Sequence, residues 1–375
     1  MLYILSKLLT PYWGPFRLLS SHAILLAAGT FCSALFCVLF LPKLWDKLPR
    51  DRGKAICSDL GGMKSAGKPT GAGFWVSLLA LPAILLFAPL KPWDLAAVGA
   101  LYAAMLFGYL DDKALVPWGE LKKGLLDAVV SVAIAAFIFL GHHETVNGEP
   151  VMLVWLPFLK GQVVMNGVGV WCIHGFVYVP VAAFVLWFTM NATNCSDGVD
   201  GLAGALTVIA LAMLAVVLYV VVGYRPVAHY FLIPVYAEAA RWAIVVMTVA
   251  GAFAAYLWYN AEPSKVLMGD AGSRYLGILV ATASLMTGNP FIVLALAPIV
   301  LVNGGGGLGK LVLLRLAKRV GFDIGEGSII RRIRFPLHDH CKKNLKWSNA
   351  QVLMRFVLLQ LVVMPILLLV LLKVR

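Results

Sequence analysis

Residues 199–223 read VDGLAGALTVIALAMLAVVLYVVVG, and the one charged residue in this run is Asp200. A helix of this length crosses the roughly 30 Å hydrocarbon core of a bilayer. Comparable apolar runs recur along the whole 375-residue chain. We expect an all-α integral membrane protein with about ten transmembrane helices, near residues 20–42, 72–90, 94–110, 125–141, 175–190, 199–223, 240–258, 274–288, 290–309 and 352–373.

The composition indicates the same class. Hydrophobic residues make up 61% of the chain and charged residues 13%, whereas soluble domains average roughly 45–50% and 25%. We therefore exclude a soluble enzyme, a disordered tail and a disulfide-stapled secreted domain. The six cysteines contain no Cys-x-x-Cys pair, which argues against a zinc site. We also expect no removable signal peptide.

The basic residues are unevenly placed. Of 31 Lys and Arg residues, 22 fall in four loops, at 43–71, 111–124, 259–274 and 310–351. These loops lie on one side of the ten-helix arrangement, and the positive-inside rule makes that side cytoplasmic. Both termini are then periplasmic. The net charge of +13 needs no nucleic-acid partner.

We treat residues 1–375 as a single polytopic membrane domain. The longest periplasmic loop, about 142–174, alternates Val, Trp and Phe with Gly and Asn-Gly. This pattern favours a short β-hairpin on the membrane surface. Five cytoplasmic segments are then expected to form the active site.

The first segment is Phe-Gly-Tyr-Leu-Asp-Asp-Lys, in which Asp111 and Asp112 close the third predicted helix. A helix C-terminus disfavours negative charge, and adjacent carboxylates repel each other. A divalent cation or basic side chains are the natural partners. The alternative is a solvated helix end with Lys113 as counter-ion.

The second segment, Met-Asn-Ala-Thr-Asn-Cys-Ser-Asp-Gly-Val-Asp-Gly, spaces its polar side chains at intervals of three. In a helix this spacing places them along one broad face, where carboxamides can donate to phosphate or nucleobase oxygens. A plain N-capped helix start is the alternative, but capping needs a single polar residue. Here there are four: Asn191, Asn194, Asp197 and Asp200.

Three more segments add a carboxylate and positive charge. Asp270 lies in Met-Gly-Asp-Ala-Gly-Ser, where backbone amides can face a phosphate while the carboxylate takes a metal; a helix cap is the alternative. Residues 331–343, RRIRFPLHDHCKK, suit an anionic substrate or serve only as a topology anchor. Residues 64–73, KSAGKPTGAG, resemble a phosphate-cradling loop without Walker A spacing.

Carboxylates for Mg²⁺, amides for phosphates and basic side chains for a pyrophosphate thus collect at one membrane surface. We infer phosphoryl transfer between a soluble nucleotide compound and a lipid phosphate.

These motifs resemble the polyprenyl-phosphate N-acetylhexosamine-1-phosphate transferase superfamily, and within it the phospho-N-acetylmuramoyl-pentapeptide transferase branch. The resemblance covers most of the chain, including Lys346-Trp347-Ser348 and Arg355-Phe356. It implies a homodimer in the bacterial inner membrane, acting with Mg²⁺ on its cytoplasmic face. The reaction would pass phospho-N-acetylmuramoyl-pentapeptide from UDP to undecaprenyl phosphate, giving lipid I and UMP for peptidoglycan synthesis, cell shape and division.

The resemblance also implies roles for individual residues. It makes Asp270 and Asp111 the metal ligands, and it leaves open whether Asp111 or Asp112 is the base. The catalytic set is then Asp111, Asp112, Asp270 and His338. The substrate-binding set is Lys64, Lys68, Thr70, Lys123, Asn191, Asn194, Asp197, Asp200, Asn260, Leu267 and His340.

The chain departs from the family pattern at four places. Three consecutive histidines become His338-Asp339-His340, and Thr-Pro-Thr becomes Lys68-Pro69-Thr70. Leu267 stands where an aromatic is expected to stack on the uracil. The ninth helix carries Asn303-Gly-Gly-Gly-Gly307 where we expect fewer glycines and an acidic residue nearby.

Three other functions remain as alternatives: a related transferase using UDP-N-acetylglucosamine, a non-catalytic scaffold, and a transporter. Transport sites usually lie near the bilayer midplane, whereas these carboxylates line one surface. Direct attack and a covalent aspartyl intermediate both fit the constellation.

Overall fold

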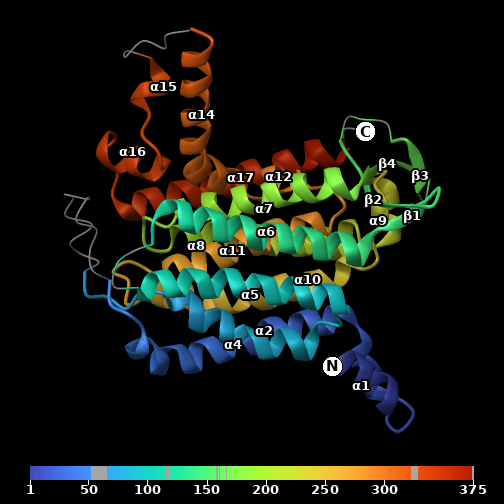
Figure 1. Cartoon of the computed structure of the whole chain (residues 1–375). Coiled ribbons are helices and arrows are strands. Elements are labelled where there is room, and N and C mark those ends of the chain that lie inside the picture. The colour runs from blue at the N-terminus through green and yellow to red at the C-terminus, as the bar shows by residue number, and fades with distance from the viewer. Residues whose placement is uncertain are drawn as a thin grey trace.

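The computed structural model describes residues 1–51, 66–114, 116, 118–157, 159, 161–165, 167–321 and 328–373. These residues form a bundle of long helices with a small sheet at one end (Figure 1). The long helices are α2 (His22–Leu44), α4 (Ala72–Phe87), α5 (Pro92–Lys113), α6 (Glu120–His142), α7 (Gly175–Cys195), α8 (Leu202–Val216), α10 (Ala239–Asn260), α11 (Gly269–Leu285), α14 (Gly306–Arg319) and α17 (Asn349–Lys373).

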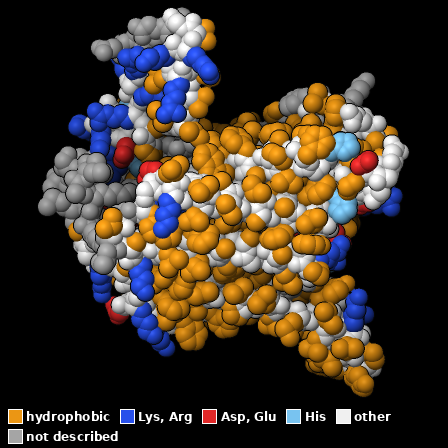
Figure 2. Space-filling model, in the orientation of Figure 1, with side chains coloured by type: hydrophobic (Ala, Val, Ile, Leu, Met, Phe, Trp, Pro, Cys, Tyr) orange, Lys and Arg blue, Asp and Glu red, His pale blue; other side chains and the backbone are white. Residues whose placement is uncertain are grey.

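Eight helices among the described residues are long and apolar enough to cross a membrane by length and composition. The sixteen-residue α4 is apolar but shorter, and the seventeen-residue α11 is also short. All ten predicted spans overlap helices of the structure. Side chains over the middle of the bundle are mostly hydrophobic, and Lys and Arg gather toward the end near α14 (Figure 2). The chain is therefore a mostly helical membrane protein.

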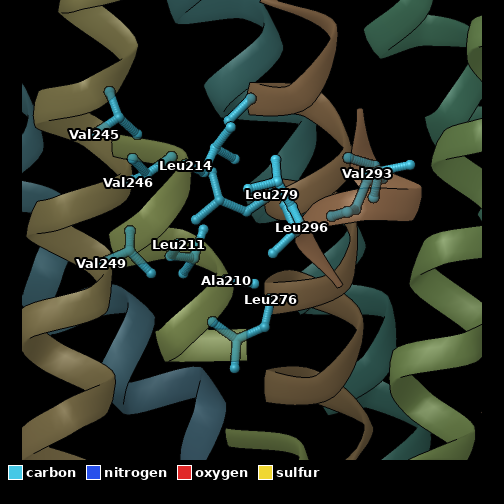
Figure 3. Close-up of a cluster of buried hydrophobic side chains, with 14 of the residues drawn as sticks. Ala210, Leu211, Leu214, Val245, Val246, Val249, Leu276, Leu279, Val293 and Leu296 are labelled. Atoms are coloured by element: carbon cyan, nitrogen blue, oxygen red, sulfur yellow. The ribbon is translucent and has the colours of Figure 1, made fainter. Parts of the chain in front are cut away.

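Helix α11 lies at the centre of the bundle. Its fifteen residues from Ala271 to Leu285 are all buried, although it carries several small and polar residues. Leu276 and Leu279 of α11 pack with apolar side chains of α8, α10 and α12 (Val293–Leu296), as Figure 3 shows. Because α11 is enclosed by protein, its N-terminal turn is held firmly at one end of the bundle.

Segment 142–174 forms a sheet of four antiparallel strands in place of the single hairpin we expected. The strands are β1 (Glu144–Val146), β2 (Glu149–Val154), β3 (Val163–Met165) and β4 (Val168–His174), in the order β1-β2-β4-β3. Asn147 and Gly148 have φ values of 54° and 85°, the left-handed conformation that a two-residue hairpin turn requires. Pairing of β2 with β4 joins two hairpins. The bundle is helical as predicted, but the chain as a whole is not all-α.

Both termini lie at the end of the bundle that carries the sheet (Figure 1). The short helices α1 (Leu2–Leu9) and α9 (Arg225–Tyr230) lie at this end too, together with the 3-10 helix η1 (Gly14–Ser20). The opposite end carries the 3-10 helix η2 (Trp45–Lys47), α15 (Ile329–Arg332) and α16 (Leu337–Lys343). The connections from α5 to α6, α7 to α8 and α10 to α11 lie at this second end, where the predicted site segments meet.

The predicted ninth span, 290–309, ends too early. The chain runs through α12, α13 (Pro298–Val300) and the π-helical turn η4 (Leu301–Gly305), and then continues as α14 to Arg319. Helix α14 projects away from the bundle (Figure 1), and none of its residues is buried. Its charged residues Lys310, Arg315 and Lys318 lowered the hydropathy that sets a span boundary, so sequence pattern placed the helix end at 309.

Candidate active site

Three helix ends meet at the end of the bundle opposite the sheet. Asp111 lies in the last turn of α5, Lys123 in the first turn of α6 and Asp270 in the first turn of α11. Lys123 Nζ lies 2.5 Å from Asp111 Oδ2 and 3.5 Å from Asp270 Oδ2. The backbone N–H of Trp118 also donates to Asp111 Oδ1, at 2.7 Å. One ammonium group therefore joins two carboxylates from different helices.

Asp112 faces the N-terminus of α11. Its Oδ1 accepts the backbone N–H of Asp270 at 3.1 Å, and its Oδ2 accepts that of Ala271 at 3.2 Å. The first N–H groups of a helix lack partners within it, and the helix dipole favours a negative charge there. Asp112 thus caps α11 and fixes the position of the Asp270 backbone.

Glycines allow these helices to approach closely. A Cβ at Gly108 of α5 would lie 2.6 Å from the Asp270 backbone oxygen, and a Cβ at Gly73 of α4 would overlap Gly272. Gly269 has a φ of 72°, which residues with a side chain rarely adopt. The first turn of α11 consequently lies directly against α4 and α5.

The segment that ends α7 is tied to α11. Ser273 Oγ donates to Asn194 Oδ1 at 2.9 Å. Asn191 donates from Nδ2 to the Trp187 backbone oxygen, four residues back in α7, at 2.9 Å. Asp197 is half-buried in the turn before α8. Of these polar groups, Asn194 thus contacts the helix that carries Asp270.

Two loops meet at Asp200. Lys68 Nζ lies 3.8 Å from Asp200 Oδ2 and donates to Ser264 Oγ at 2.9 Å, while the Ser264 N–H donates to Asp200 at 3.3 Å. The buried Asn260 accepts a backbone N–H from the turn before α8 at 2.8 Å and donates to a backbone oxygen of the α10–α11 loop at 2.8 Å. Asn260 thereby holds the two loops together.

Leu267 lies beside the loop that carries Thr70. Its N–H donates to the Pro69 oxygen at 2.8 Å, and its own oxygen accepts the N–H of Ala72 at 3.0 Å. The Leu267 side chain is half-buried. Lys64, which we also predicted to bind substrate, lies outside the described residues.

His338 is held by Asn303. Asn303 Oδ1 accepts the His338 backbone N–H at 2.9 Å and lies 3.2 Å from His338 Nδ1, so a proton on Nδ1 would leave Nε2 without one. His340 has a different partner: its Nδ1 accepts the backbone N–H of Arg334 at 3.3 Å. Burial raises the pKa of the neighbouring Cys341 thiol, which therefore stays protonated and unreactive near neutral pH.

Of the four glycines after Asn303, the first two allow close packing against α7 and the last two make room for Phe335, in the segment before His338. A Cβ at Gly305 would lie 2.6 Å from the Phe188 ring of α7, and a Cβ at Gly307 would lie 3.1 Å from Phe335. A Cβ at Gly198 would overlap the His338 ring. These glycines bring His338 against the turn between α7 and α8.

The carboxylate centre has the donor chemistry of a Mg²⁺ site. Among the described residues, no group of three or more His, Cys, Asp or Glu side chains forms a closed metal cage. Mg²⁺ is usually held by one or two carboxylates together with substrate phosphates and water. Asp111 and Asp270 supply two such carboxylates, and the Lys123 ammonium within 3.5 Å of both shows that the position between them accepts positive charge.

Our sequence reasoning missed three residues that this site uses. Asn303 was noted only as a departure, and Asp127 and Arg274 were given no role. Asp127 lies inside the predicted span 125–141, and a charged residue within a span is functional by default. That signal was available in the sequence.

Comparison with known proteins identifies the family of this chain. The family model described as Glycosyl transferase family 4 matches residues 95–288. A phospho-N-acetylmuramoyl-pentapeptide-transferase from Treponema pallidum is 42% identical over 96% of this chain and 93% of its own length. Proteins of the same name from Solibacter usitatus and Borreliella burgdorferi are 28% and 25% identical, over 95% and 92% of this chain and 95% of their own lengths. The chain therefore belongs to glycosyl transferase family 4, with the phospho-N-acetylmuramoyl-pentapeptide-transferases.

Proposed function

We propose that this protein transfers phospho-N-acetylmuramoyl-pentapeptide from its UDP carrier to undecaprenyl phosphate. An oxygen of the lipid phosphate forms a bond to the phosphorus that carries the sugar, and the bond from that phosphorus to UMP breaks. The products are lipid I, a peptidoglycan precursor, and UMP. The convergence of Asp111 and Asp270 on Lys123 carries the proposal, together with relatives of this name that match nearly the whole chain.

Asp111 and Asp270 would hold Mg²⁺ in this proposal. When bound, the metal would neutralise charge on the pyrophosphate of the donor. Lys123 would supply a second positive charge at the same place, and His338 would stabilise charge on the transferred phosphoryl group. Asp112 keeps α11 in register and remains, with Asp111, a candidate for the group that receives or orients the lipid phosphate.

The remaining predicted residues would bind the donor. Lys68, positioned by Asp200, suits a phosphate, and the amides of Asn191 and Asn194 suit phosphate or base oxygens. Leu267 would offer an apolar surface to the uracil. His340 and the arginines before it extend the positive charge toward the acidic parts of the substrate.

An apolar groove between α6 and α7 suits the polyprenyl chain of the acceptor. It has a volume of about 490 Å³, and on α6 its lining runs from Glu120 and Leu121, in the first turn, to Val132. Ala183, Phe184 and Trp187 of α7 line the opposite side. A lipid lying in this groove would have its head near the first turn of α6, the turn that also carries Lys123.

The site end of the bundle is proposed to face the cytoplasm, in the bacterial inner membrane, and both termini to face the periplasm. The excess of Lys and Arg at this end supports that orientation (Figure 2). A cysteine at position 345 in a cysteine-free background should react with an impermeant thiol reagent only from the inner face, and one at position 147 from the outer face. Labelling of position 345 in intact cells would overturn the orientation.

The test of function uses purified protein, undecaprenyl phosphate and Mg²⁺, with UMP release as the measurement. UDP-N-acetylmuramoyl-pentapeptide should be consumed and UDP-N-acetylglucosamine should not. Asp270→Asn should abolish release while the protein stays folded, because an amide carries no charge to hold the metal. Release from UDP-N-acetylglucosamine alone would assign the chain to the other branch of the superfamily. Inversion or retention at a chirally labelled phosphorus would separate direct attack from a covalent intermediate.

A further inference from the structure

Two buried charges lie behind the carboxylate centre. Asp127 of α6 and Arg274 of α11 have side chains that are 2% and 4% exposed, and Arg274 Nη1 forms an ion pair with Asp127 Oδ1. The second terminal nitrogen, Arg274 Nη2, lies 3.6 Å from Asp270 Oδ2. One guanidinium group thus joins a buried carboxylate to the carboxylate at the centre of the site.

The pairing follows from helix geometry. Lys123 and Asp127 are four residues apart on α6, and Asp270 and Arg274 are four residues apart on α11, so each pair shares one helix face. Because α6 and α11 face one another, and Asp111 of α5 lies beside Lys123, the charged side chains form a row that alternates in sign. The order is Asp111, Lys123, Asp270, Arg274 and Asp127. Every charge except the two end members lies between partners of opposite sign.

The Asp270 carboxylate needs a partner that fixes its orientation, because it is only partly enclosed by protein. Its side chain is 27% exposed, more than that of Asp111 or of Asp127. Arg274 is planar and carries its donors in a fixed fork. Once Asp127 holds one nitrogen of the fork, the direction of the other is set.

We propose that Arg274, anchored by Asp127, is a positioning residue that orients the Asp270 carboxylate for phosphoryl transfer. The proposal rests on the proposed function and adds to it a pair of residues behind the reacting groups. A purely structural ion pair between α6 and α11 is the competing explanation, and it predicts a loss of stability without a selective loss of turnover.

The decisive variant removes both charges together, as Asp127→Leu with Arg274→Met. Removing one partner leaves a buried charge unpaired, whereas replacing the whole pair by apolar residues is often neutral for folding. The double variant should keep its thermal unfolding midpoint and its donor KM. Its kcat should fall by about 100-fold, the order of loss expected when a reacting group is misplaced by about 1 Å. A folded double variant with the kcat of wild type would overturn the proposal.

Arg274→Lys provides a second, independent test of the positioning role. It keeps the charge and the pairing with Asp127 but lacks the planar fork that reaches two carboxylates in fixed directions. A structural ion pair predicts full kcat for this variant, and the positioning role predicts a reduced kcat at unchanged donor KM. If the double variant does not fold, Arg274→Lys decides between the two explanations in the same way.

The matched control is Lys122→Met, a change of an exposed charge on the first turn of α6 that should leave kcat unchanged. Wild-type turnover of UDP-N-acetylmuramoyl-pentapeptide tests the proposed function, and the ratio of variant to wild-type kcat tests the positioning role. If the wild type consumed UDP-N-acetylglucosamine instead, the ratio would be measured with that donor. A failure of the proposed function and a failure of the positioning role are thus distinguishable.

Discussion

Loss of the Lys123 charge is the sharpest test of the carboxylate centre. Lys123→Met keeps the length of the side chain but removes the ammonium group from between Asp111 and Asp270. The two carboxylates then repel one another without a shared cation. We expect the pyrophosphate of the donor to lose a positive partner at the same time, so both substrate binding and transfer should weaken.

The distances set the size of the effect. Lys123 Nζ and Asp270 Oδ2 are 3.5 Å apart, and at an effective dielectric constant of about 20 such a pair interacts by about 5 kcal/mol. The Lys123 side chain is only 16% exposed, so water screens it little. Truncating one partner of a buried charge pair costs about 2–5 kcal/mol in measured cases. With about 1.4 kcal/mol for each factor of ten, a loss of about 3 kcal/mol lowers kcat/KM on the order of 100-fold.

The assay is UMP release at saturating acceptor, with Lys122→Met as the control. Lys122 is the neighbouring residue, carries the same charge and places its Nζ over the Trp118 ring, at 3.6 Å from the ring centroid. Lys123→Arg should recover part of the activity, because it restores the charge with a bulkier group. If Lys123→Met stays folded and its kcat/KM remains within about threefold of Lys122→Met, the ammonium group lies outside the transition-state contacts.

Three further outcomes are expected. Leu267→Phe should lower the donor KM severalfold with little change in kcat, because stacking of a base on an aromatic ring is worth roughly 1–3 kcal/mol; an unchanged KM would place Leu267 away from the nucleobase. Asn303→Leu should lower kcat about tenfold, since the buried His338 loses its hydrogen-bond acceptor; wild-type kcat in this folded variant would remove His338 orientation from the mechanism. Chelation with EDTA should stop UMP release and added Mg²⁺ should restore it; full activity in EDTA would refute a metal site at Asp111 and Asp270.

The sequence predicted the bundle well because apolar runs are local signals. Each expected span overlaps a helix, and the paired aspartates fall at a helix end as their position after an apolar run indicated. Helices α1 and α9 were not predicted, since eight and six residues are too short to show a periodic pattern. The pairing of β2 with β4, which joins the strands into one sheet, was missed for another reason, because it depends on residues that the chain separates by a loop.

Contacts across the bundle were beyond sequence reasoning. The pairing of Asp127 with Arg274 joins residues 147 positions apart, and that of His338 with Asn303 joins residues 35 positions apart. A single sequence marks each such residue as unusual but does not identify its partner. The signal that was readable, a carboxylate inside an apolar span, required a counter-charge without naming it.

The four departures from the family pattern are not independent in the structure. Leu267 and the Lys68-Pro69-Thr70 loop contact each other, since the Leu267 N–H donates to the Pro69 oxygen at 2.8 Å. Asn303 and the histidine segment form the second pair, through the bonds that Asn303 makes with His338.

Neither pair includes Asp111, Asp112 or Asp270. The departures that the resemblance indicates thus lie in two segments outside the carboxylate centre. In each pair a change at one position is matched by a contact with the other position. We therefore expect the departures to alter donor KM more than the class of reaction.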